Sequence, residues 1–367
     1  GIARALTVIA LRLNERAQAA DYYHAYATRL GNAGDTGPNA SARSELGGAL
    51  LEAGLLVEAE AELKAALTLD PASAETVVRL ARVYLARKDI PAAGRTLETA
   101  IAQKGKAAPI YALLSVVYQK SGHIENAIPA MRLAIQLDPQ SEKYRFQYGI
   151  LLTDADAPAA ALIRINEALQ SFPKSTRLWL ALGLANLKMS KNTEAAQAFD
   201  HAIELDPKFA QAYAYLGMTR VAVGQYEEGA RLYEQALQRE PKLAVVHYLI
   251  ADALLKQTDA DIMRIEAHLK QAVQMDPTYA PAKLALGKLY ARTGRLTEAA
   301  AELEQVITLD PNLAEAYYQL SRTYSRLKRT AEAQTALATF RRLSDAQKQQ
   351  QQDELRDVVR RLADVLF

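Results

Sequence analysis

Prolines recur at a fixed interval along most of this chain of 367 residues. Four of them follow one another at steps of 34 residues, at Pro139, Pro173, Pro207 and Pro241. Pro277 and Pro311 are separated by the same step, and both of these prolines follow an aspartate. A period of this length is the signature of a repeat protein, in which each unit packs on its neighbours. The chain must therefore build a row of similar units.

Two columns of small residues keep the same register as the prolines. One column stands near the start of each unit, at Gly47, Ala81, Ser115, Gly149, Gly183, Gly217, Ala251, Gly287 and Ser321. The other stands twelve residues before each proline position, at Ala59, Ala93, Ala127, Ala161, Ala195, Gly229, Ile265, Ala299 and Ala333. Small side chains let two helices cross at close range. Because proline cannot continue a helix, the Asp-Pro pairs predict where each second helix ends.

These columns resemble the tetratricopeptide repeat, whose pattern is W-x2-L-G-x2-Y, then A-x3-F, then P. The best match is carried by Trp179, Leu182, Gly183, Ala195, Phe199 and Pro207, with Asn186 in place of the tyrosine. The resemblance implies an all-α fold, a right-handed α-solenoid of stacked helix-turn-helix units. Nine units are expected over residues 38–343, in one continuous solenoid. Residues 1–37 are expected to form a helical pair with a glycine-rich connector, and residues 344–367 a capping helix or, alternatively, a dimerisation helix.

Composition and motifs exclude several function classes. The chain has no cysteine, and its five histidines are scattered without a metal-binding spacing. No nucleophile, acid–base or phosphate-binding motif is present, so we expect no enzyme activity, no cofactor and no metal. The formal net charge is +2 with both signs interleaved, which predicts no nucleic-acid partner. No stretch of 18 apolar residues is present, so no membrane insertion is expected, and the compartment is unknown.

The resemblance also implies that the first helix of each unit lines a concave groove that binds peptides or proteins. The side chains expected to form a peptide-binding apolar strip in that groove are Ala112, Val116, Phe146, Ile150, Leu180, Leu184, Met218 and Tyr248. Four cations would add a basic end that prefers acidic segments, namely Lys288, Arg292, Arg322 and Arg326. The alternative is that the strip packs against neighbouring helices, and buried side chains at Ile150 and Leu184 would favour that alternative.

The function expected from these features is a non-catalytic scaffold or adaptor that binds a peptide or a helix of a protein partner in its groove. Two alternatives stay open at this point. The chain could be an accessory module of a larger enzyme, secretion system or assembly machine. It could also be a self-assembling oligomer that pairs through its terminal helices.

Overall fold

The structure is a computed structural model that describes residues 7, 10, 18–23, 25–26, 39–103 and 106–344. The expected N-terminal helical pair over residues 1–37 and the expected capping or dimerisation helix over residues 344–367 lie almost entirely outside the described residues. Contacts divide the chain into two compact units, residues 1–173 and residues 174–367, and each is described by itself. One continuous solenoid over residues 38–343 therefore stays a prediction.

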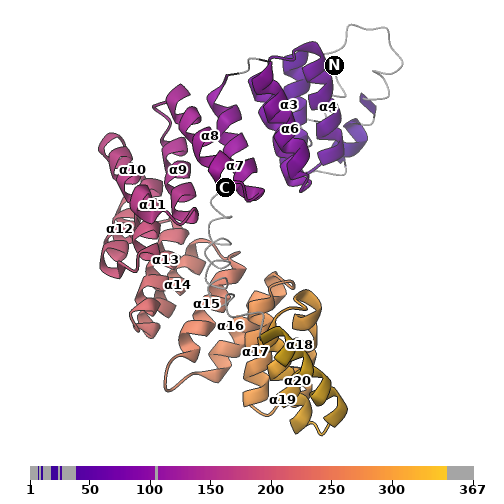
Figure 1. The fold of residues 1–367 in the computed structure, drawn as a ribbon, viewed down its shortest axis with the longest axis vertical. Coiled ribbons are helices and arrows are strands. Elements are labelled where there is room, and N and C mark those ends of the chain that lie inside the picture. Colours follow the sequence, from indigo (N-terminus) through magenta and orange to yellow (C-terminus); the bar gives the residue numbers. More distant parts are fainter. Residues whose placement is uncertain are drawn as a thin grey trace. The chain divides into compact units, whose positions relative to one another are not determined.

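The described part of each unit consists of antiparallel helical hairpins (Figure 1). The first unit contains α3 (Ala40–Glu52), α4 (Leu56–Leu69), α5 (Ala74–Ala86), α6 (Ile90–Ala102), α7 (Ala108–Lys120), α8 (Ile124–Leu137), α9 (Glu142–Asp154) and α10 (Pro158–Ser171). The second contains α11 (Thr176–Lys188), α12 (Asn192–Leu205), α13 (Ala210–Ala222), α14 (Tyr226–Arg239), α15 (Ala244–Leu255), α16 (Ile262–Met275), α17 (Ala280–Arg292), α18 (Leu296–Leu309), α19 (Ala314–Arg326) and α20 (Thr330–Ser344). Consecutive helices pack together within each unit, which confirms the all-α class and the helix-turn-helix repeat.

Glycines mark the closest approach of the two helices of a hairpin. A methyl group added to Gly183 on α11 would lie 2.3 Å from Cε1 of Phe199 on α12. The corresponding added methyl at Gly217 would lie 2.8 Å from Tyr233, and that at Gly287 would lie 2.8 Å from Leu303. Carbon atoms in contact are normally 3.5–4.0 Å apart, so these positions have no room for a side chain. Gly183, Gly217 and Gly287 are therefore required by packing.

The turn between the helices of a hairpin uses left-handed backbone at one repeat position. Four glycines there have φ between 77° and 85°, at Gly54, Gly122, Gly224 and Gly294. Four other residues adopt φ between 58° and 62° at the same position, at Lys88, Asp156, Ser190 and Lys328. Glycine enters this region without steric cost, whereas other residues do so at a small cost in free energy. The seventh hairpin, which carries two extra residues in its turn, departs from this rule among the described hairpins.

The Asp-Pro pairs end the second helices by two interactions. The backbone N–H of Asp70 completes α4 by donating to the carbonyl oxygen of Ala66, and Pro71 cannot extend the ladder. The Asp70 carboxylate then accepts the N–H of Ala72 at 3.2 Å. Aspartates 206, 276 and 310 accept the N–H two residues later in the same way, at 2.9 to 3.0 Å. Aspartate favours such turns because its side chain satisfies a backbone donor that the helix leaves free.

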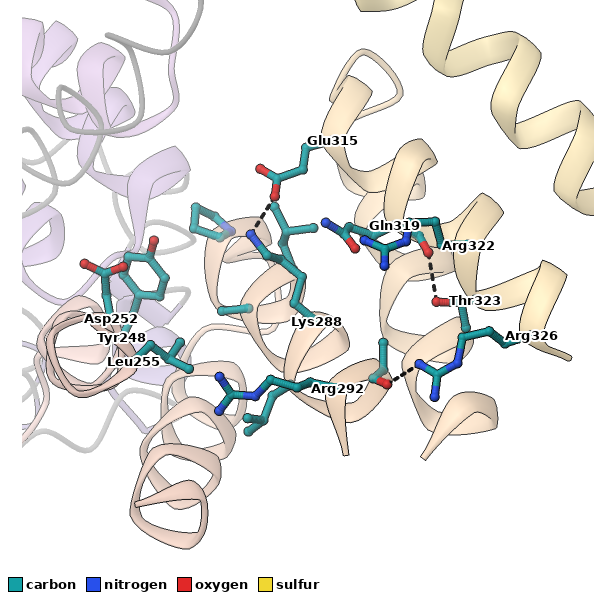
Figure 2. A pocket seen from close by; sticks show the side chains of 15 residues that line it. Tyr248, Asp252, Leu255, Lys288, Arg292, Glu315, Gln319, Arg322, Thr323 and Arg326 are labelled. Carbon is teal, nitrogen blue, oxygen red and sulfur yellow. Dashed lines mark hydrogen bonds and ion pairs between the residues drawn. The ribbon is translucent and has the colours of Figure 1, made fainter. Parts of the chain in front are cut away.

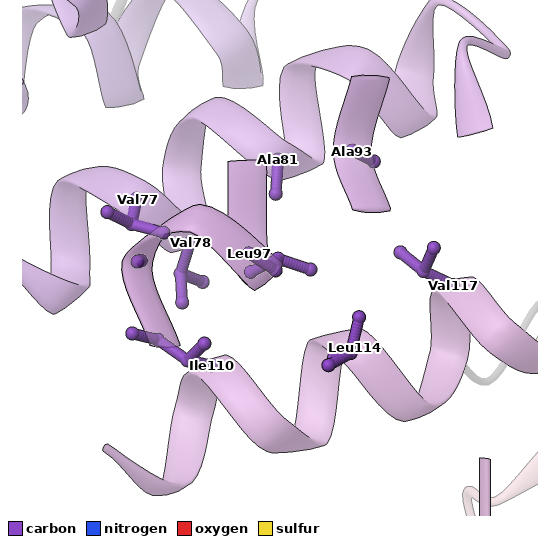
Figure 3. Packing of buried hydrophobic residues seen from close by; sticks show 9 residues of the cluster. Val77, Val78, Ala81, Ala93, Leu97, Ile110, Leu114 and Val117 are labelled. Carbon is purple, nitrogen blue, oxygen red and sulfur yellow. The ribbon is translucent and has the colours of Figure 1, made fainter. Parts of the chain in front are cut away.

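The core of each unit continues from one hairpin into the next. Figure 3 shows α5, α6 and α7 of the first unit, where Leu97 meets Val78 and Ala81 of its own hairpin. Ile110, Leu114 and Val117 close the same cluster from the next hairpin. All of these side chains are buried. Because a single hairpin cannot cover its own apolar face, its stability depends on its neighbours.

We expect Gly183→Leu to lower the free energy of unfolding by about 1–3 kcal/mol or more, because Phe199 occupies the space that the new side chain needs. The measurement is thermal and urea unfolding followed by circular dichroism. Gly94→Ala on α6 is the matched control, because its added methyl meets only Val117 at the ordinary distance of 3.5 Å. That variant should be neutral or slightly stabilising. Equal unfolding of Gly183→Leu and the wild type would show that the hairpin packing is wrong.

Candidate functional site

The apolar side chains that the sequence assigned to a groove are mostly covered. Six of the eight are buried, namely Ala112, Phe146, Ile150, Leu180, Leu184 and Met218. Ile150 and Leu184 are only 8% and 7% exposed. Val116 and Tyr248 are half-buried. Their burial favours the alternative in which the strip packs against neighbouring helices. Partner contact at these residues stays an untested prediction.

The four basic residues have a different environment. Lys288, Arg292, Arg322 and Arg326 are exposed and line one pocket of the second unit, with a volume of about 570 Å³ (Figure 2). The other lining residues come from the same three first helices, α15, α17 and α19, and are Tyr248, Asp252, Leu255, Pro281, Leu284, Ala285, Leu289, Ala291, Glu315, Gln319 and Thr323. The repeat brings these helices side by side, since α17 packs against both α15 and α19. The structure thus places the four predicted basic residues in one pocket, together with Tyr248.

The cations of the pocket differ in how they are held. The Lys288 ammonium forms an ion pair with the Glu315 carboxylate at 2.5 Å. The Arg326 guanidinium donates to the carbonyl oxygen of Ala291, at the C-terminal end of α17, where the helix dipole favours a positive charge. Arg322 lies over the ring of Tyr318, with 5.6 Å from the guanidinium carbon to the ring centroid. No described carboxylate forms an ion pair with Arg322 or Arg326.

The remaining charges of the pocket leave a positive balance. Asp252, on α15, is paired with Lys256 at 2.7 Å, so its charge is already compensated outside the lining. Arg292 has no carboxylate partner among the described residues. Three guanidinium groups are therefore available to an anion, over a lining that also contains Tyr248, Leu255 and Leu284. An arrangement of this kind can bind carboxylates or phosphates and contact an apolar side chain beside them.

A pair of histidines joins α15 to α16 on another face of the seventh hairpin. The Nδ1 atoms of His247 and His268 are 3.0 Å apart, so one ring donates its proton to the other. Burial, with the neighbouring His268 second, lowers the pKa of His247 to about 4. Burial also lowers the pKa of His268, where Glu234 and Arg264 act in opposite directions. Sequence reasoning missed this pair because the two-residue insertion lies between its members and hides their register.

The two positions of the repeat that hold the histidine pair hold side chains of opposite charge in two other hairpins. Arg43 pairs with Glu62 at 3.1 Å in the first hairpin, and Lys283 with Glu302 at 3.7 Å in the eighth. Among the described residues, no cluster of three or more His, Cys, Asp or Glu side chains could hold a metal ion. Within the fold, the histidine pair links α15 to α16 by a hydrogen bond.

The fold defines a class, the helical-hairpin repeat proteins, in which each hairpin packs on its neighbours. Tetratricopeptide repeat models match residues 8–74, 50–116, 108–141, 146–208, 198–229, 264–307 and 293–356. The chain belongs to the tetratricopeptide repeat family. No curated protein is significantly similar to the chain in sequence.

Solved structures with a similar fold include yeast Tom70, at 14% identity and a TM-score of 0.52, covering 98% of each chain. IFIT1, solved as a monomeric mutant with m7Gppp-AAAA, matches at 17% identity and a TM-score of 0.53, covering 92% of this chain and 80% of that chain. YrrB, described as a protein with an unusual peptide-binding site, matches at 22% identity and a TM-score of 0.43, covering 49% and 91%. At these identities the likeness shows the fold alone.

The sequence also predicted no membrane insertion and no nucleic-acid partner. No helix among the described residues is long and apolar enough to cross a membrane. The expected absence of a nucleic-acid partner is untested and stays a prediction, since the IFIT1 structure contains m7Gppp-AAAA.

We expect acid to destabilise the second unit through the histidine pair. In the unfolded chain both histidines have the ordinary pKa of about 6.5, whereas burial lowers the pKa of His247 to about 4 and lowers that of His268. The unfolded chain then binds more protons below pH 6.5, so the stability present above that pH is lost as the pH falls towards 4. The loss should be about 1–2 kcal/mol, because water partly screens half-buried rings.

The measurement is the unfolding midpoint between pH 7.5 and pH 5, followed by circular dichroism. His268→Gln should show a shallower dependence on pH than the wild type. His123→Gln, which alters an exposed turn residue, should behave as the wild type does. The same slope for all three proteins would exclude the pair as the source.

Proposed function

We propose that this chain is an interaction scaffold that binds an acidic segment of a protein partner in the pocket of α15, α17 and α19. The tetratricopeptide repeat is an interaction module, and that general role comes with the family. The pocket is the proposed binding site because it gathers four exposed cations from the adjacent helices α17 and α19. This clustering is the single observation that carries the proposal.

Charge decides which kind of segment the pocket prefers. The lining holds four cations and two carboxylates, although the chain as a whole has nearly equal numbers of both signs. Each of the two carboxylates already has a lysine partner. The guanidinium groups of Arg292, Arg322 and Arg326 offer planar pairs of donors that match a carboxylate. An acidic segment would therefore gain charge-assisted hydrogen bonds here.

The apolar part of the lining favours a peptide over a free anion. Leu284 and Leu289 of the lining are buried, and Tyr248 and Leu255, from α15, are half-buried. A peptide can carry carboxylate and apolar side chains on nearby residues, so it can use both kinds of surface together, whereas a free anion uses only the cations. We therefore favour a peptide of acidic and apolar residues.

The test uses a fluorescein-labelled hexaglutamate peptide, with hexaglutamine as the neutral comparison, and fluorescence anisotropy at low and physiological salt. The wild type should bind hexaglutamate more tightly, and the affinity should fall as salt rises. The double variant Arg292→Gln, Arg322→Gln should bind roughly tenfold more weakly, because it removes two cations that are partly screened by water. The double variant Arg341→Gln, Arg342→Gln makes the same charge change on α20 and should bind as the wild type does.

Two outcomes would contradict the proposal. Equal weakening in both double variants would show that only the net charge of the chain matters. Tighter, pocket-dependent binding of a hexa-adenylate RNA than of hexaglutamate would point to a nucleic-acid ligand instead of a protein segment.

A further inference from the structure

One cation of the pocket already forms an ion pair with a carboxylate of the chain itself. The Glu315 carboxylate lies 2.5 Å from the Lys288 ammonium, and the pair joins α19 to α17 across the pocket (Figure 2). Their side chains are 41% and 46% exposed, so the ion pair faces solvent and an incoming ligand can reach it. The other three cations have no described carboxylate partner.

The ion pair is a local feature of this pocket and not a requirement of the repeat. We number each repeat from the first residue of its first helix, which is Ala280 in α17 and Ala314 in α19. Lys288 is then the ninth residue of its repeat, and Glu315 is the second residue of the next repeat. At the other seven junctions between successive repeats, these two positions hold no pair of opposite charges, as Asp252 with Pro281 and Ile150 with Arg177 illustrate. Within each unit, consecutive hairpins pack together without such a pair, as α16 and α17 do. The fold alone therefore does not explain why Glu315 stands opposite Lys288.

The place of Glu315 in its helix explains why it is held there. It lies in the first turn of α19, where the helix dipole and the free backbone N–H groups favour a negative charge. The side chain is thus kept at the pocket's edge even when no ligand is bound. A carboxylate of a ligand that approaches Lys288 must break the pair with Glu315 and then lie beside a like charge.

We propose that Glu315 is an intramolecular competitor that takes the place of a ligand carboxylate at Lys288. This inference rests on the proposed function and adds a rule of selectivity to it. A segment with a single carboxylate gains little at Lys288, because one ion pair replaces another. A segment with several carboxylates reaches Arg292, Arg322 and Arg326 at the same time, and those contacts have no internal competitor. The pocket therefore selects segments with clustered acidic residues over segments with isolated ones.

The first experiment compares Glu315→Gln with the wild type in the hexaglutamate assay. Removal of the competitor should raise the affinity about two- to fivefold, the range expected when one exposed ion pair no longer has to be broken. Glu298→Gln is the matched control, because it also removes one carboxylate from an exposed ion pair, with Arg295, at a site outside the pocket. It should leave the affinity unchanged.

A double-mutant cycle separates competition for Lys288 from simple repulsion by Glu315. In a Lys288→Met background, Glu315→Gln should give little or no gain, because no ammonium is left to release. A gain as large as in the wild-type background would overturn the inference and leave only repulsion. Circular dichroism of each variant would show that the helices are intact.

The failure of this inference and the failure of the proposed function have different signatures. If hexaglutamate binds and depends on Arg292 and Arg322, but Glu315→Gln has no effect, the competitor is excluded and the proposed function stands. If no protein in the series binds hexaglutamate at low salt, both ideas fail together.

Discussion

The close approach of two helices within each hairpin is the constraint on which the rest of the structure depends. Gly183 on α11 faces Phe199 on α12 at a distance that leaves no room for a Cβ atom. The same relation recurs where Gly217 meets Tyr233 and Gly287 meets Leu303. Such contacts fix the distance and the crossing angle between the two helices of a hairpin. Because the hairpins then have similar shapes, each can pack on the next in the same way.

The pocket is a consequence of this stacking. Because each hairpin repeats the geometry of the last, the same positions of α15, α17 and α19 come together on one surface. Lys288 and Arg322 stand at one repeat position in successive units, and Arg292 and Arg326 stand at another. Residues that are 34 positions apart in the sequence therefore lie close together in the structure. The packing requires no particular residue at these exposed positions, so the charges there are free to serve binding.

One physical reason explains why the four basic side chains are exposed while most of the apolar strip is buried. A long charged side chain on a first-helix face keeps its head in water unless a buried partner holds it, as Glu302 holds Lys283, so exposure is the ordinary outcome for Lys288 and Arg322. Ile150 and Leu184 have no such preference, and neighbouring helices cover them. A repeat pattern assigns residues to a face but does not say how deep that face lies between adjacent helices.

The repeat pattern could not predict the contacts of Glu315 and of the two histidines, because it does not relate the positions that meet in them. Glu315 pairs with a residue of the preceding repeat, and no column relates the two positions. His247 and His268 are brought together across a turn whose length departs from the period. Left-handed backbone at Lys88 and Lys328 was likewise not evident, because neither residue signals it as glycine does.

By itself the sequence determined the repeat, the helical hairpins, the ends of the second helices and the set of basic residues. These features follow from local rules, namely proline stops, small residues at crossings and a period of 34 residues. Only the tertiary structure decided which side chains are buried. It also decided that three cations of the pocket lack a described carboxylate partner, and that the fourth, Lys288, forms an ion pair with Glu315. Those properties depend on distances between residues of different helices, and such distances are set by packing.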